Sequence, residues 1–250
     1  MNHYKDQRDN NQFNPIKQLG ALLLLTLTST CPVFAGQAFT GKIVINGQVY
    51  GEDDTNVIKG NGIKGSDKRD VDTFNSIKVQ GGIDVNYRHA PHVQLEIIGD
   101  QNLLPIIKTR VSNGVLIIDS DQSYQTKLPL IVELTAPNLN AVNLAGAGNI
   151  NLQGLNEKSL QLTLGGSGNV IAEGNVNVFS VRISGSGNVN AKNLESEQAD
   201  LNITGSGDIN LTVKDSLKAS IIGSGDINYF GHPRKVEPHI LGSGGVEAGD

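Results

Sequence analysis

One short motif returns six times in the second half of the chain, and it constrains the fold more than any other feature. Each copy reads Gly, a small residue and Gly again, and five of the six copies continue with Asn or Asp. The first glycines of the copies are Gly146, Gly166, Gly185, Gly205, Gly223 and Gly242. Successive copies begin 18 to 20 residues apart. A phosphate-binding loop needs one such motif, whereas a regular step of about 19 residues predicts a solenoid of stacked coils.

The residues around one copy alternate in character, as expected of a β-strand. Between Leu201 and Leu211, residues of one parity are aliphatic or glycine and residues of the other parity are polar. Because successive side chains of a strand point to opposite faces, the aliphatic set should face inward. We expect the glycines where the interior is too narrow for a side chain, or where the chain bends with positive φ. An aspartate in place of Ile203 should break contacts with two neighbouring coils.

The residue after the second glycine should form a column on the outer face. The five equivalent positions are Asn149, Asn169, Asn188, Asp208 and Asp226. Stacked coils would place these side chains roughly 5 Å apart, so we predict an outer polar ladder of side-chain hydrogen bonds. Asp208 beside Asp226 brings like charges together, which is unfavourable. A calcium ion between these two carboxylates is therefore an alternative hypothesis.

The sequence before the repeats also predicts strands. Residues 76–87 alternate between apolar and polar, and no segment keeps a helical period. Shorter apolar runs follow at 93–98, 114–119 and 128–134. We predict an all-β fold of the β-solenoid or β-helix type, with the repeats at 138–250 preceded by irregular β-strands. The whole β domain is expected to cover 76–250.

The beginning of the chain has the pattern of an export signal. Basic residues precede a short apolar core at 19–28, and Ala35 offers a small residue for cleavage. We predict a signal peptide at 1–35, followed by a polar lead-in at 36–75 with one strand at 42–50. Cys31, the single cysteine, offers lipidation as an alternative to cleavage after Ala35, and it excludes an intramolecular disulfide.

Charge and motif content exclude several classes of function. The formal net charge is −5, and removal of the leader's three basic and two acidic residues makes it −6. Such a surface repels phosphate backbones, so nucleic acid is not an expected partner. The glycine motifs match neither a P-loop nor a dinucleotide-binding loop. No segment after the leader is apolar enough to be expected to cross a membrane, and no cofactor is predicted.

The candidates for chemistry are few. The Asp208 and Asp226 carboxylates have a spacing that would suit a glycosidase, and some β-helices cleave polysaccharides. Four histidines are possible metal ligands, but no zinc-enzyme motif contains them. They are His89, His92, His232 and His239.

The basic residues of one predicted strand have no expected chemical role. Lys108 and Arg110 are expected on a solvated strand face. We therefore predict no catalytic residues and no enzyme.

Residues 70–250 resemble a known bacterial family. "FNSIKVQGGIDVNY", the strands that follow it, "LPLIVELTAPNLNAVNLAGAGNI" and the repeated "GSGD/N" are together similar to the auto-transporter adhesin head, or GIN, domains. The resemblance implies an exported, envelope-associated, β-helix-like protein without catalytic residues. We expect no autotransporter barrel in this sequence, because no segment that resembles one follows the repeats.

Three functions follow from these observations. The leading one is an exported bacterial envelope protein with an adhesin-like, non-catalytic β-solenoid head that binds a glycan or a protein at the cell surface. The second is a periplasmic or lipid-anchored structural protein of the envelope. The third is a polysaccharide-acting enzyme. The expected location is the periplasm, the outer membrane or the cell surface.

Overall fold

The computed structural model describes residues 43–45, 48–50 and 56–249. The chain divides into two compact units, 1–55 and 56–250, and each is described by itself. The predicted signal peptide, with Cys31 and Ala35, lies outside the described residues and stays a prediction. Within the part of the chain that the structure describes, no helix has the length and apolar character needed to span a membrane.

The first unit contains two short strands where one was expected. β1 (Ile43–Ile45) pairs antiparallel with β2 (Gln48–Tyr50). The sequence between them is Asn46-Gly47, the dipeptide that two-residue hairpins favour. The expectation of one continuous strand is wrong, because the residues on either side of this dipeptide form two paired strands.

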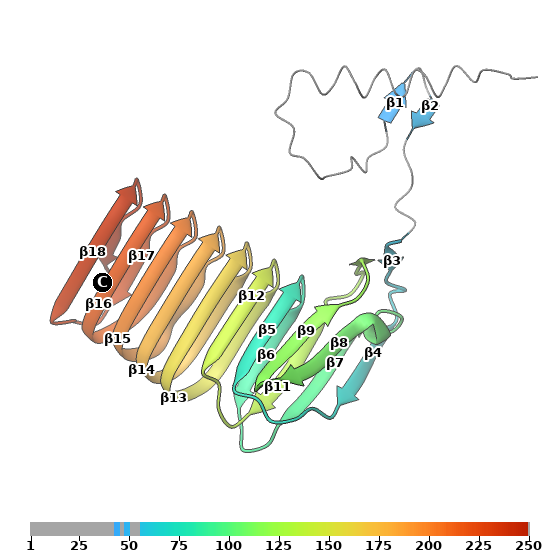
Figure 1. Ribbon diagram of the computed structural model, residues 1–250, viewed down its shortest axis with the longest axis horizontal. Helices are drawn as coiled ribbons and strands as arrows, with labels where there is room; N and C mark the ends of the chain where they lie inside the picture. The colour runs from blue at the N-terminus through green and yellow to red at the C-terminus, as the bar shows by residue number, and fades with distance from the viewer. Residues whose placement is uncertain (1–42, 46–47, 51–55, 250) are drawn as a thin grey trace, which may run out of the picture. The chain divides into compact units, whose positions relative to one another are not determined.

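The second unit is the predicted β-solenoid (Figure 1). Its repeats form long, bent strands that turn from one sheet into the other, with irregular register at the bends. These are β12 (Ala141–Gly146), β13 (Asn149–Gly166), β14 (Asn169–Gly185), β15 (Val189–Gly205), β16 (Ile209–Gly223), β17 (Ile227–Phe230), β18 (Lys235–Gly242) and β19 (Val246–Ala248). The coils pair in parallel, as a stack of repeats requires. The all-β solenoid prediction is confirmed.

Seven of the strands before the repeats belong to the same two sheets. They are β4 (Lys64–Arg69), β5 (Ser76–Gly81), β6 (Asp84–His89), β7 (Gln94–Asp100), β8 (Ile107–Ser112), β9 (Val115–Ser120) and β11 (Ile131–Ala136). β3 (Ile58–Lys59) and β10 (Tyr124–Gln125) pair in parallel as a separate two-stranded sheet, and the 3-10 helix η1 (Leu104–Ile106) precedes β8. β5 and β6 form a first coil, because they pair in parallel with β12 and with the start of β13.

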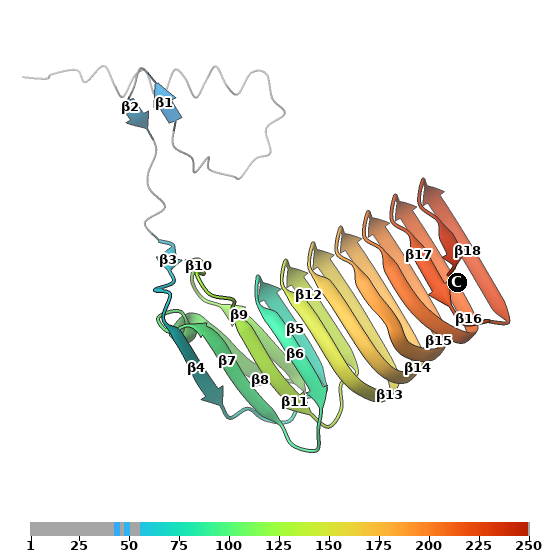
Figure 2. The ribbon, with the colours of Figure 1, turned by 180° about the vertical axis from the view of Figure 1, so that it is seen from behind.

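Each coil contributes one strand segment to each sheet. Sheet 1 has the order β8-β9-β5-β12-β13-β14-β15-β16-β18. Sheet 2 has the order β4-β7-β11-β6-β13-β14-β15-β16-β17-β19. Figure 2 shows the same stack from behind. In the repeats, the Gly-small-Gly turn connects a sheet 1 segment to the sheet 2 segment that follows it.

Residues 90–140 form a cap on the N-terminal end of the stack. They supply β7 and β11 to sheet 2, and β8 and β9 to sheet 1, partly in antiparallel pairing. Arg69, at the end of β4, ties the two sheets together there. Its guanidinium donates to the backbone oxygens of Ile107 at 2.6 Å and Leu104 at 2.9 Å.

The inward residues form a continuous aliphatic core between the sheets. Ile203 is 1% exposed, and the equivalent positions of neighbouring coils are also buried. Ile183, Ile203 and Ile221 are paired in register along sheet 1, so each coil covers the apolar side chain of the next. The predicted inward parity is therefore confirmed, and burial of these side chains contributes about 25 cal/mol per Å².

The first glycines of the motifs are required by the backbone of the preceding coil. Gly205 has φ +134°, and a Cβ there would lie 2.1 Å from the oxygen of Gly185. That oxygen is fixed because it accepts a hydrogen bond from the N–H of Ser206 at 2.9 Å. A side chain is excluded at Gly205 because the backbones of neighbouring coils approach each other closely there. The positive φ, one of the two reasons for glycine expected from the sequence, also applies at this position.

Candidate functional site

The ladder residues bind the backbone of the next coil. Oδ1 of Asn188 accepts from the N–H of Asp208 at 2.9 Å, and Oδ1 of Asp208 accepts from the N–H of Asp226 at 2.9 Å. Oδ1 of Asp226 accepts in turn from the N–H of Gly245 at 2.7 Å. Gly245 has no side chain, so the series of side-chain acceptors ends in the last coil.

The asparagines of the ladder also bond to one another. Nδ2 of Asn169 donates to Oδ1 of Asn149 at 3.0 Å, and Nδ2 of Asn188 donates to Oδ1 of Asn169 at 3.1 Å. Asp84 of β6 adds a rung before the repeats, because its Oδ1 accepts from the N–H of Asn149 at 2.7 Å. The ladder side chains are thus engaged in holding the coils together.

A second row of polar residues lies two positions further along each strand. We call Asn86, Asn151, Asn190, Asn210 and Asn228 the amide row. Consecutive residues of the row are paired in register across sheet 2, with Ile171 between Asn151 and Asn190. All five asparagines are exposed or partly exposed. They share the parity of the ladder and therefore lie on the outer face of sheet 2.

The amide row differs from the ladder in what its side chains bind. Within the described residues, Asn151, Asn210 and Asn228 make no side-chain hydrogen bond. Asn190 accepts only from the N–H of Lys192, and Asn86 donates to Oε1 of Glu133 at 2.8 Å. An asparagine amide offers two donors and an acceptor. The row therefore presents unused hydrogen-bonding groups at the regular spacing of the strands, about 4.8 Å.

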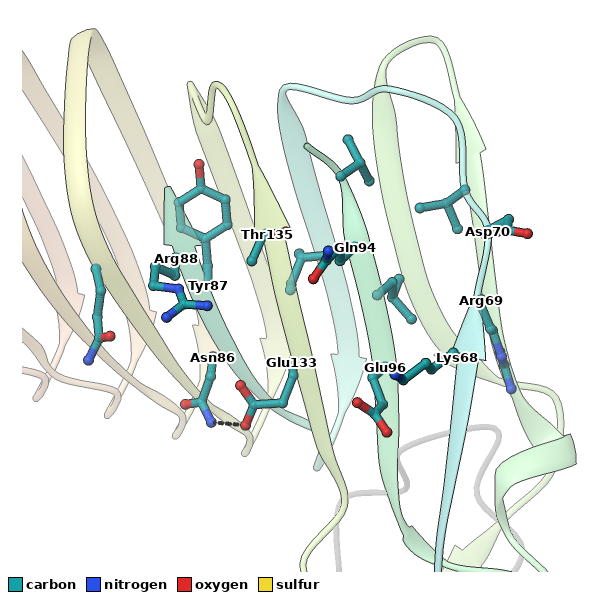
Figure 3. Close-up of a pocket in the computed structure, with 15 residues that line it drawn as sticks. Lys68, Arg69, Asp70, Asn86, Tyr87, Arg88, Gln94, Glu96, Glu133 and Thr135 are labelled. Carbon is teal, nitrogen blue, oxygen red and sulfur yellow. Dashed lines mark hydrogen bonds between the residues drawn. The ribbon is translucent and has the colours of Figure 1, made fainter. Parts of the chain in front are cut away.

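The amide row continues into a groove over the cap. Lys68, Glu96 and Glu133 extend the register of Asn86 across β4, β7 and β11. Figure 3 shows these side chains in one line on the same side of the sheet. The groove has a volume of about 530 Å³, and its second line of residues is Asp70, Gln94, Thr135, Arg88 and Gln153. It thus runs across the strands, in the direction of the row.

Charges of both signs line the groove without pairing. Glu96 and Glu133 lie directly opposite each other on antiparallel strands, where Cβ atoms are about 5 Å apart. Lys68 is opposite Glu96, and Arg88 is on the neighbouring strand to Glu133. Among the described residues, none of these four side chains forms an ion pair with another.

The floor of the groove is held in place by a buried tyrosine. Tyr87 is buried, and its hydroxyl donates to the oxygen of Ala136 at 3.0 Å. Burial, with the charge of Glu157, raises the pKa of Tyr87 to about 12.

Asp100 is a buried carboxylate of the cap and lies outside the groove. It accepts backbone hydrogen bonds from Gly62 at 2.6 Å, Lys127 at 2.8 Å and Leu128 at 3.0 Å. The pKa of Asp100 is lowered, chiefly by the bond from Leu128 and against the opposing effect of burial. It joins the segment at Gly62 to the segment at 127–128 within the cap.

The other residues singled out in the sequence are not brought together. His89, His92, His232 and His239 are all exposed, and the described residues contain no group of three or more His, Cys, Asp or Glu that could hold a metal. Lys108 and Arg110 lie exposed on β8. Lys108 pairs with Asp121 at 3.2 Å, and Arg110 pairs with Asp119 at 2.8 Å. Asp208 and Asp226 are adjacent in the ladder, and calcium there stays a hypothesis.

The sequence analysis did not identify the amide row or Asp84, although a repeated sequence pattern marks them. Asp or Asn followed two residues later by Asn occurs at Asp84-x-Asn86 and at Asn149-x-Asn151. It recurs at 188–190, 208–210 and 226–228. The groove has no comparable signal, because its residues come from strands that are far apart in the sequence.

The geometry defines the class of protein as a parallel β-solenoid with an N-terminal cap. Residues 73–233 match the family described as "Putative auto-transporter adhesin, head GIN domain". The chain belongs to this family, as the resemblance in its sequence predicted. No curated protein matches the chain.

Solved structures share the fold. A putative adhesin from Bacteroides fragilis is similar with a TM-score of 0.63 and 23% identity, covering 76% of this chain and 99% of that one. A putative adhesin from Parabacteroides merdae has a TM-score of 0.53 and 24% identity, covering 78% and 100%. A putative lipid binding protein from Parabacteroides distasonis has a TM-score of 0.53 and 22% identity, covering 77% and 99%.

Proposed function

We propose that the β domain is the binding head of an exported bacterial envelope protein, and that it holds an extended glycan along the amide row without catalysing a reaction. Membership of the adhesin head family supports a binding role and an envelope location. The head would act as a rigid rod, because its ladder and glycine columns fix every coil to the next.

The observation that carries this proposal is the set of three amides in the row that make no side-chain hydrogen bond in the part of the chain that the structure describes. Asn151, Asn210 and Asn228 face outward in one register, with no side-chain partner among the described residues. Their donors and acceptors suit sugar hydroxyls. A row with one amide on every coil except that of Ile171 suits a polymer that lies along the solenoid axis and repeats on a similar length scale.

The engagement of the ladder carboxylates supports a role without catalysis. One oxygen each of Asp208 and Asp226 accepts a backbone N–H of the following coil. A glycosidase pair must exchange protons with substrate and water. Using these side chains as backbone acceptors fits a structural role better.

The test compares two faces of the same domain. The mature protein is passed over a panel of immobilised polysaccharides, as is the variant Asn151→Ala/Asn210→Ala/Asn228→Ala. The control is Asn143→Ala/Thr163→Ala/Ser220→Ala, which removes polar groups from one register row on the outer face of sheet 1. We expect the amide-row variant to lose affinity about tenfold or more, since each lost hydrogen bond contributes about 1 kcal/mol. Equal retention of both variants, or retention only of proteins on a parallel panel, would contradict a glycan-binding row.

The location is tested separately. Intact cells that carry the native protein with a C-terminal tag are treated with protease, and lysed cells serve as the control. Loss of the tag from intact cells is expected of a surface head. Protection until lysis would replace adhesion with a structural role inside the envelope.

A further inference from the structure

The groove over the cap differs chemically from the amide row that leads into it. The row offers only neutral amides, whereas the groove holds Lys68, Arg88, Glu96 and Glu133. All four residues are exposed or partly exposed, so their charges can meet a ligand. The change occurs at Asn86, which belongs to both.

The arrangement of the two glutamates is unfavourable for folding alone. Like charges directly opposite each other on neighbouring strands are destabilising. Asn86, on the strand at the other side of β11, donates to Oε1 of Glu133 and so turns this carboxylate toward the amide row, which leaves the space between it and Glu96 open. Figure 3 shows both carboxylates on the open side of the sheet. Rule-breaking positions of this kind are expected at functional sites.

In the described structure, the cations of the groove form no close ion pair with the glutamates. Lys68 is opposite Glu96, yet the described residues include no ion pair within 4.0 Å between them, nor between Arg88 and Glu133. Elsewhere on the surface such pairs do form, for example Lys214 with Glu195 at 2.7 Å. The groove thus keeps separate positive and negative groups available to a ligand.

We propose that the groove is a charge-selective subsite for a zwitterionic sugar polymer. An ammonium group of an amino sugar lies between Glu96 and Glu133, and the carboxylate of a neighbouring sugar lies against Arg88. Lys68 closes the far end of the line. This inference rests on the proposed function, because it is the polymer on the amide row that continues into the groove.

An ammonium group fits this site better than a metal ion does. Calcium takes six to eight oxygen ligands, and the described residues offer no group of three carboxylates or histidines here. An ammonium group needs only a few acceptors, and it can use the free oxygens of the two glutamates.

The test uses four tetrasaccharides that differ in charge. Chitin tetrasaccharide is neutral, its deacetylated form carries ammonium groups, hyaluronan tetrasaccharide carries carboxylates, and N-deacetylated hyaluronan tetrasaccharide carries both. Binding to the full mature chain is measured by calorimetry at 0.15 M salt. We expect the zwitterionic probe to bind about threefold to tenfold more tightly than the neutral one, the range for partly exposed ion pairs.

Variants assign the preference to the groove. Glu96→Gln/Glu133→Gln should remove the preference for ammonium groups, and Arg88→Gln should remove the preference for carboxylates. Glu195→Gln/Glu197→Gln is the control, because it changes the net charge equally at a distant site and should leave both preferences intact.

The outcomes separate this inference from the proposed function. If all four probes bind equally and the amide-row variant binds all of them more weakly, the glycan-binding row stands. The proposal that the groove selects ligands by charge is then overturned. A preference that the distant control also removes would likewise overturn it. If no probe binds, or if the amide-row variant binds all probes like the unmodified chain, the proposed function and this inference both fail.

Discussion

The carboxylate of Asp208 accepts a hydrogen bond from the backbone N–H of Asp226 at 2.9 Å. This contact explains why the ladder position accepts both Asn and Asp, because only a side-chain oxygen is needed to receive the backbone donor of the next coil. It also leaves two like charges on adjacent coils.

Replacement of Asp208 should separate these two effects. Asp208→Ala removes the acceptor of the Asp226 N–H and should destabilise the domain by about 1 kcal/mol. Asp208→Asn keeps the acceptor, removes the repulsion and can donate to Asn188, so it should be neutral or slightly stabilising. Urea unfolding of the two variants checks this. A larger loss with Asn than with Ala would show that the charge itself is needed.

The calcium hypothesis has a direct test. Since the ladder oxygens already bind backbone N–H groups, we expect EDTA to leave the melting temperature unchanged. The melting temperature is measured with EDTA and with added calcium, on the unmodified chain and on Asp208→Asn/Asp226→Asn. A rise with calcium that the double variant lacks would establish a site between the two carboxylates.

The glycine column should tolerate no side chain. Gly205→Ala places a Cβ 2.1 Å from the oxygen of Gly185 at φ +134°, and should cost at least about 2 kcal/mol. Gly165→Ala is the matched control, because its nearest atom, the oxygen of Leu144, is 3.9 Å away. Thermal unfolding compares them. Similar melting temperatures for both would mean that the coils are not in close contact at Gly205.

Asp100 should make the cap sensitive to acid. Its folded-state pKa lies below the unfolded value. Its contribution to stability is therefore complete above roughly pH 4, the ordinary aspartate value, and is lost as the pH falls through the folded pKa. Asp100→Asn should lower the urea midpoint at pH 7 and differ less from the unmodified chain at pH 3. A difference that does not shrink with acid would indicate that the carboxylate charge contributes nothing.

The repeats could be predicted because all the information lies within one coil. The parity of Ile203 and Asp208 fixes inward and outward faces, and the regular step fixes the stacking. The cap could not be predicted in this way. Gly81 pairs with Gly146, 65 residues away, and residues 90–140 lie between them. Nothing local to "QGGIDV" indicates that a coil is completed so far along the chain.

The candidate site shows the same division. The amide row follows from a pattern repeated in each coil, and Asn210 could have been recognised beside Asp208. The groove depends on the register of Glu96 with Glu133 and of Glu133 with Asn86. These pairings join antiparallel and parallel strands, and only the folded chain brings them together.

The most direct test of the glycan-binding row observes its side chains. The chain without its predicted signal peptide is labelled with ¹⁵N-asparagine, and the side-chain amide signals are followed by NMR as N-deacetylated hyaluronan tetrasaccharide is added. We predict shifts for Asn86, Asn151, Asn190, Asn210 and Asn228, with the signals of Asn143 and Asn202 on sheet 1 unchanged. Shifts confined to Asn143 and Asn202, or no shift at saturating probe, would contradict the assignment of the binding face to sheet 2.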